Sequence, residues 1–300
     1  MRHYVVADVH GFFGAMKSAL EKQGFFEDSE PHKLIICGDL FDRGTEALHL
    51  QDFVLDLMER DQIILIRGNH EDLTLQLLHG WPQDSHRQYH HHSNGTIDSV
   101  LQLTGKSMDD LLNNPESVGR AFLQTPYIQK IIPAMVDYYE VGSYIFTHCW
   151  IPCTKIELTP YKSEYVVVPD WREADENLWN AARWVNGMEA AHNGGAVEGK
   201  TIVCGHWHCS FGHANYEYDG GEFDNHPNFT PYCGNGIIAL DACTVKSGFV
   251  NCIIVEDMGE DSAMQRVYAH LEEAKKDISA GRTQPADAVF AEIQRKLKEN

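Results

Sequence analysis

The sequence lacks the patterns that mark membrane-bound, secreted or disulfide-stapled proteins. No apolar run approaches the roughly 20 residues that span a bilayer. A strand-like stretch at residues 4–7 begins almost at once, so we expect no signal peptide. None of the eight cysteines belongs to a CxxC pair, the spacing of many zinc and redox sites, and several lie within or beside apolar stretches. We therefore expect a cytoplasmic protein with reduced, buried thiols and no membrane association.

Positive charge is also scarce. Lys and Arg number 24 against 44 Asp and Glu, which gives a formal net charge of −20. Because neutralising phosphates takes Lys and Arg, nucleic acid is not an expected partner. Bound divalent cations would offset the negative charge locally, so a small phosphorylated substrate could still be attracted. With 300 residues, 43% of them hydrophobic and 23% charged, the chain fits one large α/β domain with at most a modest appendage.

A short apolar stretch that ends in polar residues recurs along the chain. Residues 33–37 form a β-branched run typical of a buried strand, and Asp39, Asp42 and Arg43 follow it. Similar stretches occupy residues 4–7, 63–66, 144–147 and 201–204. Apolar residues at helical spacing predict a helix over 15–23, between the first two stretches, and another over 50–58, between the second and the third, with Thr45 as its N-cap. A third helix is expected from near Asp72. This order predicts βαβ units and a parallel sheet, with ligands at the carboxyl ends of its strands.

Other segments complete the expected organisation. The strand signal lapses over residues 81–137, which we expect to form a helical insertion that shapes substrate access. Two more strands are expected at 237–240 and 249–255, with a loop around 246–248 between them. We expect the tryptophans at 171, 179 and 184 to pack in the core and not to form a platform on which bases stack. Residues 258–300 are charged and helical in pattern, and we expect them to extend a domain of residues 1–257.

The strand ends supply oxygen and imidazole ligands without a required thiolate. This donor set suits Mn²⁺, Fe²⁺ or Zn²⁺, and its size allows two ions that share one carboxylate and activate a hydroxide for phosphoryl displacement. Arg43 could grip phosphate oxygens, and His70, held by Asp42, could protonate a leaving alkoxide. The expected ligands are Asp8, His10, Asp39, Asn69, His148, His206 and His208.

These residues stand in motifs that resemble those of the calcineurin-like metallophosphoesterases, over about residues 3–255. The matching motifs, in chain order, are DVHG at 8–11, GDLFDRG at 38–44, GNHE at 68–71, the lone His148 and GHWH at 205–208. Within that superfamily the second and third motifs are similar to the branch of serine/threonine protein phosphatases and symmetrical diadenosine tetraphosphate hydrolases. The resemblance implies a four-layer fold, a central β-sandwich flanked by helices. It also implies two divalent ions, with Mn²⁺ preferred and Fe²⁺ or Fe³⁺, Zn²⁺ or Ni²⁺ as alternatives.

The resemblance also assigns roles to individual residues. The first ion would be held by Asp8, His10, Asp39 and His208. The second would be held by Asp39, Asn69, His148 and His206. His70 with Asp42 matches the proton-donating pair, and Arg43 matches a phosphate-contacting position, as does Arg67, for which a structural ion pair is an equal alternative. A second phosphate-binding arginine is expected between His148 and His206, and we favour Arg183 over Arg172.

Two departures from the family pattern leave the substrate open. Cys149 and Trp150 follow the lone histidine where glycine or alanine is usual, a bulky change expected at the pocket edge, and His208 is absent from typical protein phosphatases. The expected substrate is a phosphomonoester, either a phosphoprotein or a small phosphorylated metabolite. The enzymatic alternative is a dinucleoside polyphosphate or a phosphodiester. An alternative of another class is a non-catalytic metal-binding interaction module.

Overall fold

The computed structural model describes residues 1–82, 91–159 and 162–256. The chain divides into a unit of residues Met1–Asp257 and a unit of residues Met258–Asn300, and the features below belong to the first. The helical extension expected over 258–300 lies outside the described residues, as do positions 83–90 of the expected insertion. Across the described ranges, no helix has the length and apolar character needed to cross a bilayer.

The first sheet has four strands in the order β11-β1-β2-β3. Its members are β1 (Arg2–Val6), β2 (His32–Cys37), β3 (Ile63–Ile66) and β11 (Cys252–Glu256). β1, β2 and β3 run parallel, whereas β11 pairs antiparallel with β1. The β-branched runs that predicted strands at 4–7, 33–37 and 63–66 therefore form adjacent strands whose carboxyl ends share one edge.

The second sheet has five strands in the order β4-β5-β8-β10-β9. Its members are β4 (Tyr138–Val141), β5 (Tyr144–Thr147), β8 (Thr201–Cys204), β9 (Tyr232–Gly234) and β10 (Ile237–Ala239). The central strands β5, β8 and β10 are parallel, and the antiparallel strands β4 and β9 form the edges. β4 and β9 were not expected from the sequence.

Alternating side chains show that the two sheets pack face to face. In β1, Tyr4 and Val6 belong to one core and Val5 to another. The core that contains Val5 also contains Phe146 of β5 and Val203 of β8, so it lies between the sheets. A strand buried on both faces does not alternate between apolar and polar residues, which explains the continuous apolar runs of the strands in the first sheet. This arrangement confirms the expected four-layer sandwich.

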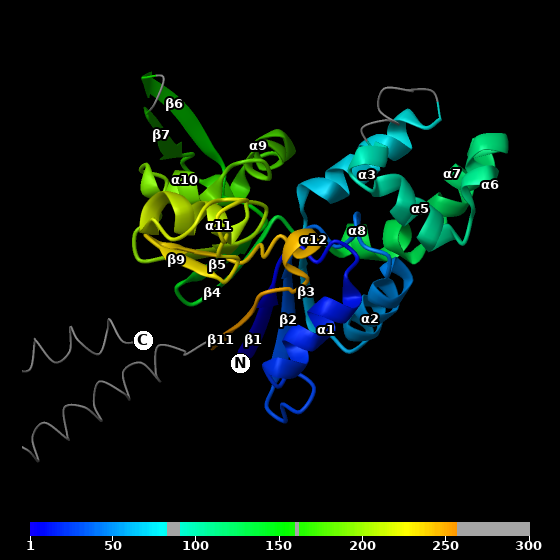
Figure 1. Ribbon diagram of the computed structural model, residues 1–300, viewed down its shortest axis with the longest axis horizontal. Coiled ribbons are helices and arrows are strands. Elements are labelled where there is room, and N and C mark those ends of the chain that lie inside the picture. Colours follow the sequence, from blue (N-terminus) through cyan, green and yellow to red (C-terminus); the bar gives the residue numbers. More distant parts are fainter. Residues whose placement is uncertain (83–90, 160–161, 257–300) are drawn as a thin grey trace, which may run out of the picture. The chain divides into compact units, whose positions relative to one another are not determined.

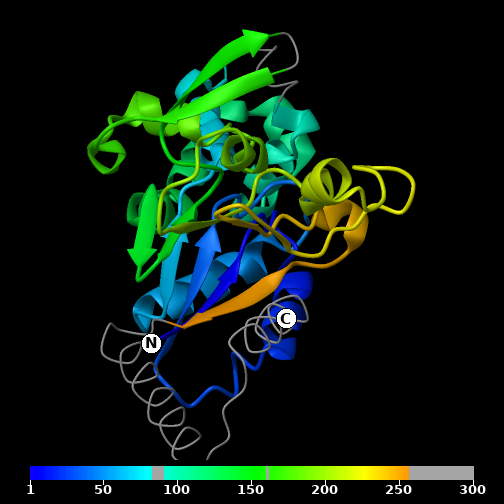
Figure 2. The same ribbon diagram turned by 90° about the vertical axis from the view of Figure 1, so that its left-hand side faces the viewer.

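Helices cover the outer face of each sheet (Figures 1 and 2). On the first sheet lie α1 (Phe13–Lys22) and α2 (Ala47–Glu59), whose apolar faces join the core around Tyr4 and Val6. On the second lie α9 (Glu176–Ala182), α10 (Gly187–His192), α11 (Cys209–Gly212), the 3₁₀ turn η2 (Trp171–Glu173) and the π-helical turn η3 (His213–Glu217). The N-cap of α2 is Glu46, not the expected Thr45, and its side chain makes no capping hydrogen bond.

The insertion is helical throughout the part that is described. After α3 (Asn69–Gly80) come α5 (Thr96–Thr104), α6 (Met108–Asn113), α7 (Pro115–Leu123), η1 (Tyr127–Ile131) and α8 (Ile132–Ala134). α3 begins at Asn69, three residues before the expected start, because Glu71 forms a capping box with the backbone at Gly68. The helices α5 and α7 pack into the core beside α2. The insertion therefore covers the first sheet next to the loop that carries Asp42.

One segment was not predicted and one expectation needs correction. The strands β6 (Cys153–Thr159) and β7 (Lys162–Val167), which were not expected, pair antiparallel and extend away from the larger sheets (Figure 1). Most β6 side chains are exposed, so the strand has no core-facing alternation to detect. The expected loop at 246–248 is partly helical, since α12 (Thr244–Ser247) ends at Gly248 in a left-handed conformation.

Candidate metal centre

The loops after β1, β2, β3, β5 and β8 bring the expected ligands together where the two sheets meet. Ligand atoms of three groups of side chains lie within 4.8 Å of one another: Asp8 with Asp39 and His148, His10 with Asp39 and His70, and His148 with Cys149 and His206. Asp8, His10, Asp39 and His206 have positive φ angles of 49–67°. Such left-handed backbone is costly for residues with a side chain and is typical of functional sites.

Asp39 occupies the centre of this group. Its carboxylate lies 3.4 Å from Nε2 of His148, 3.7 Å from Nε2 of His10 and 3.9 Å from Nε2 of His70. Burial opposes ionisation of this carboxyl, but the attraction of His148 and the other histidines lowers its pKa below the usual range. Asp39 is therefore an anion at neutral pH, which suits a shared ligand of two cations.

Asn69 joins histidines from two strands of the second sheet. Its side-chain oxygen lies 2.8 Å from Nε2 of His148 and 2.9 Å from Nδ1 of His206. Burial, together with the neighbouring His148, lowers the pKa of His206 to about 3. A neutral imidazole is the form that binds a metal, so these side chains offer uncharged donors beside the anionic Asp39.

The Nδ1 atoms of His10 and His148 each have a fixed backbone partner. Nδ1 of His10 lies 2.9 Å from the carbonyl oxygen of Phe41, and Nδ1 of His148 lies 2.9 Å from that of Cys37. Metal-binding histidines commonly donate their second N–H in this way, which fixes the ring and its tautomer. The oxygen and imidazole set, its spacing and its outer contacts fit a pair of borderline divalent ions.

His208 is held differently from the other histidines. Its Nδ1 lies 2.8 Å from Oδ2 of Asp241, whose other oxygen accepts the backbone N–H of Cys243. Although burial opposes protonation, the hydrogen bond to Asp241 raises the pKa of His208 to about 10. His208 lines the same cleft as Asp39 and His206, but it belongs to none of the three close groups. Asp241 therefore orients this ring.

Glycines before two of the ligand loops leave the space that the ligands occupy. A Cβ at Gly205 would meet Oδ2 of Asp8 at 1.7 Å, and a Cβ at Gly68 would meet Oδ1 of Asp39 at 2.2 Å. Neither contact is sterically possible, since real Cβ atoms do not approach within 3.0 Å. The glycines that open the GNHE and GHWH motifs are therefore required by close packing against a carboxylate from another loop.

Glu71 supports the centre from below and was not predicted as a site residue. The backbone N–H groups of Asp39, Leu40 and Gly68 donate to its carboxylate at 3.1, 3.0 and 2.8 Å. Its side chain is fully buried, and burial, with the nearby charge of Asp39, raises its pKa to about 7. Glu71 stands three positions after the N-cap Gly68, where a capping box has its glutamate. This sequence signal could have identified Glu71.

The expected proton donor has the expected neighbours. Nδ1 of His70 lies 2.6 Å from Oδ2 of Asp42, which also accepts the hydroxyl of Thr96 at 2.8 Å. Burial opposes protonation of His70, but Asp39 and Asp42 raise its pKa above the ordinary value. Nη2 of Arg43 lies 3.2 Å from Nε2 of His70. Thr96 belongs to the helical insertion, so the insertion contributes directly to this arrangement.

A cleft of about 360 Å³ opens over the centre. Its floor includes Asp39, Asn69 and His206. Trp184 forms part of the wall and is 48% exposed, so the expectation that all three tryptophans pack is wrong for this one. The other lining residues are His10, Arg43, His70, Leu73, Asn94, Trp207, His208 and Phe223.

Arg183, expected to contact phosphate, and Arg67, for which a structural ion pair was the equal alternative, do not line this cleft. Arg67 pairs with Asp72 at 2.5 Å and with Glu176 at 3.2 Å. Arg183 is 2% exposed, lies 2.8 Å from Asp72 and also pairs with Asp137. The resemblance placed a phosphate-binding arginine between the two histidine motifs and Arg183 was favoured, but its main ion-pair partners come from distant segments. Arg172 likewise pairs with Glu140, at 2.6 Å.

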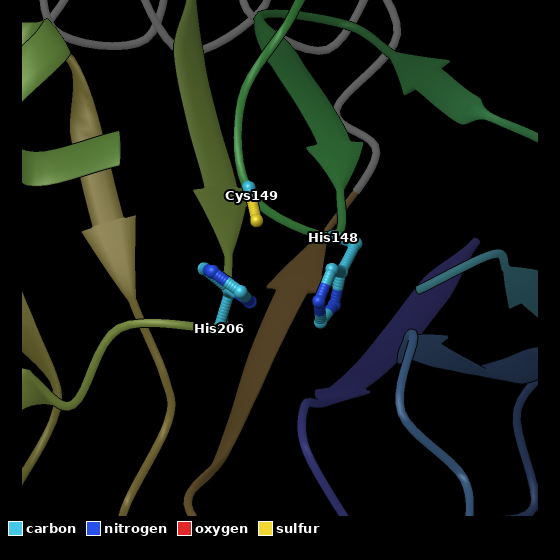
Figure 3. Close-up of side chains that lie close together, drawn as sticks. All are labelled: His148, Cys149 and His206. Carbon is cyan, nitrogen blue, oxygen red and sulfur yellow. The ribbon is translucent and has the colours of Figure 1, made fainter. Parts of the chain in front are cut away.

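Cys149 and Trp150 are buried in the core of the second sheet and not at the pocket edge. Figure 3 shows the Cys149 side chain near His148 and His206. Its thiol donates to the carbonyl oxygen of Arg183 at 2.7 Å, and burial raises its pKa well above the usual value. Cys149 is thus a protonated packing residue. The histidines beside it offer nitrogen atoms as candidate metal ligands.

The comparison with protein families decides the assignment. A family model described as calcineurin-like phosphoesterase matches residues 1–210. The chain belongs to the calcineurin-like phosphoesterase family. All five motifs that predicted this membership, from DVHG at 8–11 to GHWH at 205–208, lie within the matched range.

Individual relatives match only part of the chain, at modest sequence identity. A symmetrical bis(5'-nucleosyl)-tetraphosphatase of Buchnera aphidicola subsp. Acyrthosiphon pisum (strain Tuc7) is 28% identical over 139 residues, 44% of this chain and 43% of that protein. The asymmetrical bis(5'-nucleosyl)-tetraphosphatase PrpE of Anoxybacillus flavithermus (strain DSM 21510 / WK1) is 32% identical over 78 residues, 24% of this chain and 32% of that protein. The match thus spans less than half the length of each relative.

Among solved structures, the cold-active protein-tyrosine phosphatase of a psychrophilic Shewanella species aligns over 85% of this chain and 75% of its own length. The TM-score is 0.46 and the sequence identity 18%.

Proposed function

We propose that this chain is a dinuclear metal-dependent phosphoesterase that hydrolyses a phosphomonoester. The observation that carries the proposal is the position of Asp39, whose carboxylate lies within 4 Å of Nε2 of His10, His70 and His148. We assign Asp8, His10, Asp39 and His208 to one ion, which would displace the proton that His208 carries when no metal is bound. We assign Asp39, Asn69, His148 and His206 to the other. Mn²⁺ is the preferred metal.

Two divalent ions bound there would supply a hydroxide nucleophile and neutralise charge on the phosphate oxygens. The protein contributes positioning and protons. Arg43, exposed at the cleft, is placed to contact phosphate oxygens in a two-point interaction. His70, with its raised pKa, donates a proton to the leaving oxygen. Asp42 holds its ring in position, and Thr96 donates a hydrogen bond to Asp42.

The test uses the purified full chain with its metal content measured. Reconstituted with Mn²⁺, the protein should hydrolyse 4-nitrophenyl phosphate, and Asp39→Asn should abolish this turnover. Asp52→Asn, on the exposed side of α2, is the matched control and should behave as the unmodified protein. Unchanged turnover in Asp39→Asn would contradict the dinuclear assignment, and metal binding without any turnover would favour a non-catalytic binding module.

A second candidate is hydrolysis of a dinucleoside polyphosphate. It is favoured by the names of the curated relatives, which are bis(5'-nucleosyl)-tetraphosphatases, and by the aromatic side chains in the cleft wall. A panel of phosphopeptides, sugar phosphates, diadenosine tetraphosphate and cyclic phosphodiesters separates the candidates. Release of inorganic phosphate from monoesters alone supports the first, whereas two nucleoside diphosphates from diadenosine tetraphosphate support the second.

A further inference from the structure

We propose that Trp184 is the specificity-determining wall that receives a planar aromatic leaving group, and that Arg183 positions it. The inference rests on the proposed phosphoesterase function and names the substrate class: phosphate esters or anhydrides that carry an aromatic ring next to the reacting group. Trp184 lines the cleft together with Asp39 and Asn69. Its ring centroid is 5.8 Å from that of His206, at 85° to it, so it does not stack face to face on the imidazole.

The exposure of Trp184 contrasts with its neighbours in the sequence. Trp171 and Trp179 are 4% and 2% exposed, and Trp179 stacks on Tyr138 at 5.5 Å with an interplanar angle of 10°. The segment is thus well packed, and only Trp184 of these three leaves about half of its side chain uncovered. An exposed tryptophan in the wall of a cleft is a large apolar surface available to a ligand.

The residue before Trp184, Arg183, is buried and fixed by several contacts. The guanidinium of Arg183 is held by Asp72 of α3, by Asp137 just before β4 and by Glu176 of α9. The carbonyl oxygen of the same residue accepts the thiol of Cys149 at 2.7 Å. These partners come from separate parts of the fold, so the turn after α9 is held in place and the indole is presented in one position.

This arrangement gives Arg183 a role that replaces the phosphate contact expected from the sequence. The side chain is too deeply buried and too fully paired with carboxylates to reach a substrate. It acts through Trp184, as a positioning residue. The bidentate geometry of a guanidinium between carboxylates is not reproduced by an ammonium group, so a lysine at this position would retain the charge and lose the orientation.

A ring placed against Trp184 gains stacking and apolar burial. Aromatic pairs contribute 0.5–1.5 kcal/mol beyond area burial, which corresponds to about a twofold to tenfold difference in affinity at 1.4 kcal/mol per tenfold. A larger ring gains more than a smaller one. Phe223, 43% exposed and 5.4 Å from His208, lines the same cleft, but Lys246 lies 4.4 Å above its ring. Trp184 is therefore the freer surface.

The experiment compares 1-naphthyl phosphate with phenyl phosphate, whose leaving groups are similar in acidity and differ in ring area. With Mn²⁺-loaded full chain, the KM for the naphthyl ester should be about fivefold lower than for the phenyl ester, with similar kcat. Trp184→Ala should bring the ratio of KM values close to one, and Trp184→Phe should restore part of it. Leu178→Ala, exposed on α9 outside the cleft lining, is the matched control and should keep the full ratio.

Arg183→Lys tests the positioning role. We expect it to reduce the KM ratio between the two esters, which a purely structural role would not change. A lowered Tm with an intact ratio would assign Arg183 to stability alone and overturn its positioning role. An intact ratio in Trp184→Ala would overturn the whole inference.

A binding measurement separates failure of this inference from failure of the proposed function. If the unmodified protein hydrolyses neither ester, the phosphoesterase proposal fails. Calorimetric titration with 1-naphthylphosphonate and methylphosphonate, which have no ester bond to hydrolyse, then decides the matter. Preference for the naphthyl compound that disappears in Trp184→Ala supports the aromatic wall, and equal binding of both compounds overturns it.

Discussion

Glu71 fixes the backbone of Asp39: its buried carboxylate accepts the Asp39 N–H at 3.1 Å and, through the same oxygen, the N–H of Gly68 at 2.8 Å. The two loops that follow β2 and β3 are therefore joined beneath the candidate metal centre. Oδ1 of Asp39 in turn accepts the backbone N–H of His70 at 3.0 Å. The orientation of the central carboxylate depends on a side chain that would not itself contact an ion.

Glu71→Gln should weaken metal binding. An amide offers one acceptor in place of two, so at least one of the three N–H donors would face an N–H group. Partners that orient ligands typically change metal affinity by about 10- to 100-fold, and we expect a loss of about tenfold in a calorimetric Mn²⁺ titration of chelator-treated protein. Glu46→Gln, where the carboxylate accepts only the N–H of Gly14 among the contacts described, should show no loss. Unchanged affinity in Glu71→Gln would contradict this role.

Asp42→Asn should impair proton donation more than metal binding. Without the carboxylate, the pKa of His70 falls and its ring loses the partner at 2.6 Å. General acid catalysis contributes about 10²–10⁴-fold, so kcat for phenyl phosphate should fall about 100-fold. The loss should be smaller for 4-nitrophenyl phosphate, whose leaving group needs less protonation. Thr96→Val, which removes one hydrogen bond to Asp42, should have a milder effect, and equal losses on both esters would exclude His70 as the acid.

Gly205→Ala should disrupt the site without unfolding the sheets. The new Cβ would meet the Asp8 carboxylate at 1.7 Å and Cβ of Ala7 at 2.7 Å, so Asp8 must move. We expect a loss of high-affinity Mn²⁺ binding in calorimetry, with the far-ultraviolet circular dichroism retained. Gly14→Ala is the control, because its Cβ would meet only the Glu46 side chain, at 3.4 Å. Helix propensity predicts that this control stabilises α1 by about 0.5–1 kcal/mol.

Arg183→Met should lower the free energy of unfolding substantially. Removal of one partner from a buried ion pair leaves the other charges unpaired, at a cost of about 3 kcal/mol, and Asp72 is 10% exposed in its side chain. Arg60→Met removes a pair with Asp56 in which both side chains are exposed, and such pairs contribute less than about 0.5 kcal/mol. Urea unfolding of both variants measures the difference. Similar stability of the two variants would contradict the structural importance of the Arg183 cluster.

The parts of the fold that were predicted are those with strong local patterns. β2 was predicted because its apolar run is buried on both faces and Gly38 ends it. The ligand loops were predicted because each follows such a strand, and all of them except the loop with His148 also contain a glycine. The hairpin of β6 and β7 was missed because its first strand is exposed on both faces. No hydrophobic alternation marks a strand that does not pack against a core.

The phosphate contact expected of Arg183 depended on the family resemblance and not on a local pattern. The main partners of Arg183 are Asp72, 111 positions earlier, and Asp137, 46 positions earlier. No local pattern specifies such a pairing, so a basic residue between two histidine motifs was interpreted as a phosphate contact. Glu71 could have been predicted, since a glutamate three positions after Gly68 at a helix start is a local signal. The three backbone N–H groups that donate to Glu71 could not have been predicted, because two of them belong to the loop after β2.

Both sheets contribute to the cleft floor: Asp39 follows a strand of the first, whereas His206 follows a strand of the second, and His148 follows its neighbouring strand. Any ligand that contacts residues from both sheets therefore couples the motion of one sheet to that of the other. Sliding at the interface between Val5 and Phe146 would alter the 3.4 Å separation of Asp39 and His148. Methyl relaxation in this interlayer core should consequently report ligand binding at the cleft, at residues that touch no ligand themselves.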